Sequence, residues 1–197
     1  MSRQFYQLDG FIIARRELGE ADWLLLVITS DYGLIKVVAK GVRLTKSKLR
    51  PSLTRFRPVQ LTVVKGREIW RLVGAERVSG ESLPLPLERL FAKLAVLLER
   101  LVPPEAPASE LYDELDAGFA YFSRLTRVAE LSPAALAAGE TVLVLRILKA
   151  LGYASPAADL PAELWRGHWN QELLSRATTV KRQTITVINQ ALAASQL

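Results

Sequence analysis

A run of cations with no opposing carboxylate occupies residues 39–58, which we call the basic segment. None of its residues is Asp or Glu. Its cations are Lys40, Arg43, Lys46, Lys48, Arg50, Arg55 and Arg57. Cations at this density can contact several phosphates of a nucleic-acid backbone, and the release of counterions would make such binding weaken with added salt. The alternative interpretation is a charged surface that is merely solvated.

Aromatic rings near these cations could add base stacking, which holds single strands without sequence preference. Phe56 lies inside the basic segment, and Trp70 lies in a strand-like segment that also contains Arg71. Both are candidates for stacking on bases. Because side chains alternate along a strand and the buried face is not known from the sequence, both rings could equally belong to the core.

The sequence lacks the motifs expected of an enzyme. It has one histidine, His168, no cysteine and no glycine-rich phosphate loop. Four carboxylates cluster at 110–116, but acidic residues there suit the first turn of a helix, where they interact favourably with its dipole. We therefore predict a protein that is not an enzyme and that holds no metal or other cofactor.

Charge is distributed unevenly along the 197 residues, whose formal net charge is +6. Residues 1–82 contain fifteen Lys or Arg against eight Asp or Glu, whereas residues 83–197 contain eleven against twelve. This asymmetry predicts a polyanionic partner for the N-terminal part. No apolar run reaches about 18 residues, so we expect no membrane span, and the N-terminus does not resemble a signal peptide. A cytoplasmic location is expected.

The N-terminal part is predicted to form strands. A turn at residues 30–33 joins two of them into a hairpin, and Gly66 separates the last two in the same way. Short strands joined by turns and one long basic loop predict a small β-barrel, with the OB-fold as the best-fitting example and an SH3-like barrel as the second choice. The predicted strands are 11–15, 23–29, 34–40, 59–65 and 68–76.

The C-terminal part is predicted to form helices. Apolar residues recur at helical spacing from Leu87 to Val102, and further helices are expected to begin near Ser109, Ser132 and Glu172. Gly152 is expected to end the third, whose apolar residues on all sides predict a central position. The predicted fold class is α+β. A five-stranded OB-fold nucleic-acid-binding domain (1–80) precedes an α-helical domain (81–197).

Several blocks of this sequence resemble the RecO family of bacterial recombination mediators. They occur in the family's order, and the segment LRILKALGY at 145–153 resembles its central helix. The N-terminal blocks are GEAD (19–22), the turn from Thr29 to Gly33, AKGVR (39–43), KSKL (46–49) and LTRF (53–56). The resemblance implies an N-terminal OB-fold, a helical domain, and binding to single- and double-stranded DNA.

The resemblance also implies an activity and partners. Members of the family anneal complementary strands and act with RecR, and in many bacteria with RecF, to load RecA onto DNA coated by single-stranded-DNA-binding protein. The C-terminal tail of that protein would contact the helical domain. The basic segment becomes the expected DNA contact, with Arg15 and Arg16 as further candidates, and the expected location is the bacterial nucleoid.

The sequence departs from the family pattern after the central helix. Many members carry a four-cysteine zinc site there, whereas residues 154–171 read ASPAADLPAELWRGHWNQ and contain no cysteine. Zinc is therefore not expected, and we interpret the chain as a short variant of the family.

Three other classes of function remain open. An RNA-binding OB-fold protein of translation or ribosome assembly would prefer RNA in competition with DNA of the same sequence. A protein-interaction module would show no salt-dependent binding to any oligonucleotide. An enzyme would require turnover that depends on His168 or on the carboxylates at 110–116.

Overall fold

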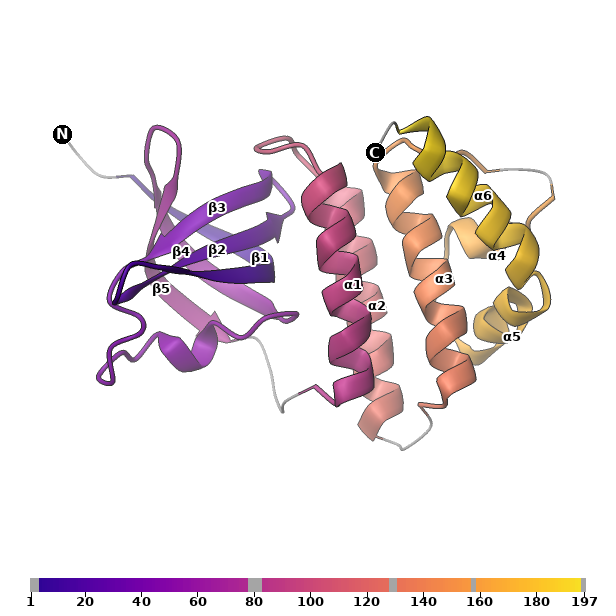
Figure 1. Cartoon of the computed structure of the whole chain (residues 1–197), viewed down its shortest axis with the longest axis horizontal. Coiled ribbons are helices and arrows are strands. Elements are labelled where there is room, and N and C mark those ends of the chain that lie inside the picture. Colours follow the sequence, from indigo (N-terminus) through magenta and orange to yellow (C-terminus); the bar gives the residue numbers. More distant parts are fainter. Residues whose placement is uncertain (1–3, 78–82, 128–130, 157–158, 196–197) are drawn as a thin grey trace. The chain divides into compact units, whose positions relative to one another are not determined.

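The computed structural model describes residues 4–77, 83–127, 131–156 and 159–195 (Figure 1). The chain divides into two compact units. The first comprises residues 1–82 and 91–112, and the second comprises residues 83–90 and 113–197. The predicted domain boundary at residue 80 lies outside the described residues. No helix within the described ranges is both long enough and apolar enough to cross a membrane.

The described strands close into a barrel in the order β1-β2-β3-β5-β4 (Figure 1). Strand β1 pairs with both β2 and β4, and a short parallel contact between β3 and β5 completes the closure. The strands are β1 (Phe5–Leu18), β2 (Asp22–Thr29), β3 (Gly33–Ala39), β4 (Pro58–Lys65) and β5 (Trp70–Arg77). The predicted five-stranded barrel followed by helices is confirmed.

Residues 91–112 complete the first unit. They include the end of α1 (Leu85–Leu101) and the start of α2 (Ser109–Arg127). The Phe91 ring packs against Phe11, with ring centroids 5.6 Å apart, and stacks on Phe56, with centroids 6.4 Å apart. The segment between the two helices is fixed to the β2–β3 turn, because the Ala108 amide donates to the Ser30 carbonyl at 3.0 Å.

The second unit is built around α3 (Pro133–Ala150), as predicted from its apolar sequence. Ser132 caps its N-terminus by accepting a hydrogen bond from the Ala135 amide at 3.1 Å. Helix α3 packs against α4 (Ala162–Trp165), α5 (Gln171–Thr179) and α6 (Lys181–Ala194). The helical pattern predicted from Glu172 is divided at Val180, where β-branched residues and threonine hydroxyl bonds to the preceding turn weaken the helix.

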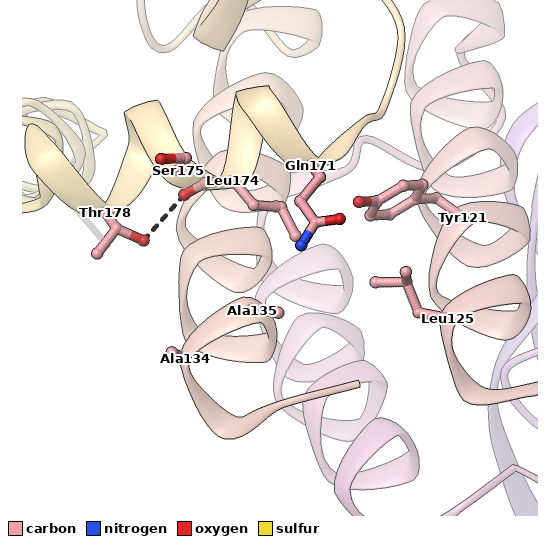
Figure 2. Close-up of a pocket in the computed structure, with 8 residues that line it drawn as sticks. All are labelled: Tyr121, Leu125, Ala134, Ala135, Gln171, Leu174, Ser175 and Thr178. Atoms are coloured by element: carbon pink, nitrogen blue, oxygen red, sulfur yellow. Dashed lines mark hydrogen bonds between the residues drawn. The ribbon is translucent and has the colours of Figure 1, made fainter. Parts of the chain in front are cut away.

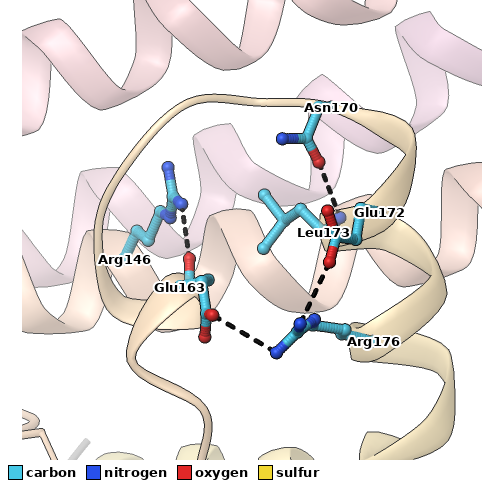
Figure 3. Close-up of polar contacts among 6 residues, drawn as sticks. All are labelled: Arg146, Glu163, Asn170, Glu172, Leu173 and Arg176. Atoms are coloured by element: carbon cyan, nitrogen blue, oxygen red, sulfur yellow. Dashed lines mark hydrogen bonds and ion pairs between the residues drawn. The ribbon is translucent and has the colours of Figure 1, made fainter.

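A buried arginine of α3 forms hydrogen bonds to the backbone of the segment that precedes α5 (Figure 3). Arg146, 1% exposed, donates from Nη2 to the Glu163 carbonyl at 2.8 Å and from Nη1 to the Gly167 carbonyl at 2.9 Å. Its Nε donates to the Leu164 carbonyl at 3.1 Å, and Nη1 also contacts the Glu114 carboxylate at 3.2 Å. One guanidinium thus ties α4 and its following loop to α3.

Candidate nucleic-acid interface

The basic segment connects β3 to β4 and is fixed to the barrel at several points. Val42 and Leu53 are fully buried in the barrel core. The Gly41 amide donates to the Asp22 carboxylate at 2.7 Å, and the Phe56 amide donates to the Ile12 carbonyl at 2.7 Å. A short 3-10 helix, Arg50–Ser52, lies within the segment. The cations are therefore presented from a defined backbone.

Most of the predicted cations are accessible. Lys40, Lys46, Lys48, Arg50 and Arg55 are exposed, and Arg43 is half-buried. Arg57 is different, because it is only 5% exposed.

Arginines from two parts of the sequence meet in a cleft of about 470 Å³. Within the described residues, its walls carry four guanidinium groups, one carboxylate and one indole. We call this the arginine cleft. It is lined by Arg15, Glu17, Trp23, Arg43, Arg50 and Arg55. The lysines of the basic segment are not among the described residues that line it, so the structure divides the predicted cations into a convergent group and a dispersed group.

A β-bulge decides that Arg15, rather than Arg16, faces the cleft. The register between β1 and β2 shifts between Ile12 and Ala14, so that Arg15 lies opposite Leu25 of the barrel core. Residues directly opposite each other on paired strands project to the same face. Arg16 therefore projects to the other face, where it forms an exposed ion pair with Glu99. Bulges commonly re-aim side chains in this way.

Arg15 is the most constrained cation of the cleft. Its guanidinium lies over the Trp23 ring, 3.9 Å from the ring centroid, and its Nη1 donates to the Leu53 carbonyl at 3.4 Å. Burial lowers the pKa of Arg15, and the positive charges of Arg55 and Arg50 lower it further. Arginine nevertheless stays protonated in proteins, so the cleft holds like charges close together.

Arg43 is held at the rim of the cleft by the β1–β2 turn. It pairs with Glu17 at 3.0 Å and donates from Nη1 to the Gly19 carbonyl at 2.7 Å. The carboxylate of the cleft is thus in direct contact with one of the four arginines. The lining side chains, counted over the described residues, carry four positive charges and one negative charge, a net of +3.

The two rings predicted as candidates for base stacking are core residues. Phe56 is 2% exposed and stacks with Phe91, and Trp70 is 1% exposed and donates from Nε1 to Glu105 at 3.2 Å. A base could reach either ring only if the residues that cover that ring moved away. Sequence reasoning missed Trp23, because its contact with Arg15 depends on the bulge, for which the sequence offers no clear signal.

The helical unit offers a different kind of surface. A pocket of about 170 Å³ lies between α2, α3 and α5, and its described lining contains no charged side chain (Figure 2). It is lined by Tyr121, Leu125, Ala134, Ala135, Gln171, Leu174, Ser175 and Thr178. Such a pocket can take an apolar group but supplies no cation for a phosphate.

The residues considered for catalysis are not assembled into a site. His168 is exposed between the buried Trp165 and Trp169, and Glu114 is the ion-pair partner of Arg146. Across the described ranges, no group of three or more His, Cys, Asp or Glu is arranged to hold a metal ion.

The closed barrel and its arginine-lined cleft define an OB-fold protein with a cationic surface. Comparison with known proteins shows what this chain is similar to. Residues 1–80 match the family described as "Recombination protein O N terminal". This match and the relatives described next confirm the resemblance to the RecO family that the sequence blocks indicated.

The relatives include proteins named "DNA repair protein RecO" from three bacteria. That of Gloeothece citriformis is 42% identical over 114 residues, which cover 56% of this chain and 40% of the relative. That of Trichodesmium erythraeum is 38% identical over 116 residues, covering 57% and 40%. That of Desulfitobacterium hafniense is 32% identical over 154 residues, covering 75% and 52%. The chain thus spans about half the length of the relatives it matches.

Proposed function

We propose that this protein binds DNA without sequence preference and anneals complementary strands during recombinational repair. The observation that carries the proposal is the arginine cleft, with its net charge of +3 over the described lining residues, beside the exposed lysines of the basic segment. Similarity to relatives that are named DNA repair proteins supports the same conclusion.

The chemistry of the cleft suits phosphate rather than bases. A guanidinium presents donors in a planar fork that matches two phosphate oxygens, and its charge is permanent. Contacts to phosphate position a strand but carry no sequence information. When cations neutralise the backbones of two strands, the repulsion between them falls, and base pairing then supplies the specificity. No covalent step is needed, which agrees with a function that is not enzymatic.

The partners follow from the family and are part of the proposal. We infer that the protein acts with RecR, and with RecF where the cell has it, to help load RecA onto DNA coated by single-stranded-DNA-binding protein. The C-terminal tail of the coating protein would bind the helical unit. These events would take place at the nucleoid in the bacterial cytoplasm.

The test is the annealing of two complementary oligonucleotides at several salt concentrations. The informative variant is Arg50→Gln/Arg55→Gln, and the matched control is Lys46→Gln/Lys48→Gln, which removes the same charge from outside the cleft. We expect annealing by the wild type that weakens with salt, a large loss in the arginine variant and a smaller loss in the lysine variant. Circular dichroism would show that each variant is folded.

Equal losses in both variants would mean that total charge matters and the cleft does not. No annealing by the wild type at any salt concentration would overturn the proposed activity. Competition with RNA of the same sequence separates DNA from RNA as the partner, because both share the phosphate that the cleft would recognise.

A further inference from the structure

The outer face of the barrel is covered in one region and open in another. Phe11 of β1 pairs with Ile28 of β2, and both are buried although neither belongs to the barrel core. The outward residues in the first half of β1 are instead exposed, and they are Phe5, Gln7 and Asp9. The face that β1 forms with β4 and β5 is therefore accessible to a partner.

The strand register places an exposed aromatic ring and an exposed arginine in one row of this open face. Phe5 of β1 pairs with Val64 of β4, and Val64 pairs with Arg71 of β5. Residues directly opposite each other project to the same face, and the adjacent Tyr6 and Trp70 pack with the core, so this row points outward. Two strand spacings separate Phe5 from Arg71 by about 10 Å. Phe5 is 59% exposed, so its ring is available to a ligand.

Positive charge is available beside the ring. Arg71 is exposed, as is Arg67 in the segment between β4 and β5, and within the described part of the chain neither forms an ion pair. Lys65 is paired with Glu105 at 3.1 Å, so it adds no net charge, and Glu68 is an exposed carboxylate of the same segment. This end of the face therefore presents two arginines against one carboxylate.

The opposite end of the same face is acidic. Asp9 of β1 pairs with Gln60 of β4, which pairs with Glu76 of β5, and all three are exposed. Asp9 lies four residues from Phe5, about 13 Å along the strand. A polyanion is attracted to the Phe5 end of the face and repelled from the Asp9 end.

An exposed ring beside arginines suits a single strand of nucleic acid. Every base has a π-face, so stacking on a ring tolerates any sequence, while cations bind the backbone that joins the bases. In a duplex the faces of the bases are already stacked on one another. A ring on an open sheet face thus favours single strands over duplexes, which the cations alone do not.

We propose that the row Phe5–Val64–Arg71 is a second contact for single-stranded DNA. The Phe5 ring stacks on a base, and Arg71 and Arg67 bind adjoining phosphates. The site rests on the proposed function and deepens it, because it adds a contact to bases where the arginine cleft contacts phosphate. Phe5 lies ten residues along β1 from Arg15 of the cleft, roughly 30 Å of strand, so the two contacts are separate.

Anisotropy titration of Phe5→Leu tests the ring. The substitution removes the π-face and keeps an exposed apolar side chain. We expect the affinity for a labelled single strand to fall on the order of tenfold, the affinity for a duplex to stay unchanged, and Phe5→Trp to retain single-strand binding. The matched control is Val96→Ala, which shortens an apolar side chain of α1 that is 63% exposed, and it should change neither affinity.

Two further readouts separate stacking from charge. Phe5→Leu should leave the slope of log affinity against log salt unchanged, because stacking on a ring releases no counterions, whereas Arg71→Gln should reduce that slope by about one. A strand of equal length with abasic sugars in place of nucleotides should bind the wild type and Phe5→Leu equally. A residue that only supported the fold would not produce this pattern.

Equal affinities of the wild type and Phe5→Leu for the single strand overturn the stacking site and leave the proposed DNA binding intact. A loss that is the same for single strand, duplex and abasic strand overturns it as well. So does unchanged strand binding with a dimer that Phe5→Leu converts to a monomer in sedimentation, since the face would then join copies of this chain. A wild type that binds no strand overturns the proposed function, and this site with it.

Discussion

The two units of the molecule use arginine in opposite ways. In the helical unit, Arg146 is buried, and its donors bond to carbonyls of the same unit and to Glu114. In the barrel unit, four arginines converge on a cleft with a single carboxylate in its described lining. The same side chain is therefore structural where it is buried among its acceptors, and a candidate for binding where several arginines line an open cleft.

The comparison shows why a count of arginines in the sequence does not find a site. Arg57 and Arg146 are both buried, whereas Arg50 and Arg55 are exposed, and composition does not separate them. What separates them is how far the folded chain buries each side chain. The predictions below test what that difference in burial means for stability and for binding.

The largest effect is expected from Arg146→Leu in the helical unit. The substitution leaves three carbonyls and the Glu114 carboxylate without their donor, and breaking a buried ionic cluster typically costs about 3–5 kcal/mol of unfolding free energy. The measurement is urea unfolding. Arg146→Lys should recover little, because an ammonium cannot reproduce the fork.

The control for Arg146 is Arg176→Leu in the same unit. Arg176 pairs with Glu163 at 3.2 Å and with Glu172 at 3.0 Å, but its side chain is 48% exposed (Figure 3). Exposed pairs contribute about 0–1 kcal/mol, so a small change is expected. If both substitutions cost the same, burial of the acceptors is not what makes Arg146 structural.

The next effect concerns how closely the helical unit is packed. A Cβ at Gly139 of α3 would lie 2.0 Å from Cζ of the buried Phe122 ring, so Gly139→Ala should cost about 1–3 kcal/mol through overpacking. The control is Gly118→Ala in α2, whose Cβ would meet a Leu143 methyl at 3.1 Å. Thermal unfolding should separate the two, and a neutral Gly139→Ala would show that the helices can move apart.

Much of the fold follows from local sequence. The turn at 30–33, the alternation in 59–65 and the cap at Ser132 each predict an element that the structure contains. The division of the last helical pattern at Val180 was harder to predict, because β-branched residues lower helix propensity only slightly and the threonine hydroxyl bonds are visible only in the folded chain.

The candidate site is less readable from the sequence than the fold. The density of cations in 39–58 indicated a segment that supplies three of the arginines lining the cleft, because net charge is a sum that needs no geometry. The convergence of Arg15 with that segment depends on a bulge of one residue and on contacts across dozens of residues of chain. The burial of Trp70 could not be predicted from the sequence either. Alternation along a strand gives two faces, and only closure of the barrel decides which of them is buried.

The bulge provides a sharper test of the cleft, with an expected effect near tenfold in affinity. Arg15→Gln removes a cation from the cleft and should weaken binding to single-stranded DNA by about 1.5 kcal/mol, the value of one hydrogen bond to a charged group. Arg16→Gln removes an adjacent cation that pairs with Glu99 on the other face and should change affinity little. Anisotropy titrations at one salt concentration would decide, and equal losses would mean that the bulge has no bearing on binding.

The smallest expected effect is a change in the stability of the barrel unit when charges near Arg15 are removed. The sign of that change shows whether these charges stabilise or destabilise the fold. The charged form of Arg15 is disfavoured in the folded state, since burial and the neighbouring charges of Arg55 and Arg50 lower its pKa. A lowered pKa of a cation means that folding becomes more favourable as the proton is lost, which for arginine lies at strongly alkaline pH. Substitution is therefore a better test than titration.

Removing neighbouring charges by Arg50→Gln/Arg55→Gln should leave the unfolding free energy unchanged or raise it, within about 0.5 kcal/mol. The same variant should lose DNA binding, so the cost of the substitution would fall on binding and not on stability. At Arg146, in contrast, the cost falls on stability. Urea unfolding of the wild type and the variant measures their stability, and anisotropy titration with single-stranded DNA measures their binding. A destabilised variant would show that these arginines hold the basic segment in place, and the contrast between the two units would then no longer hold.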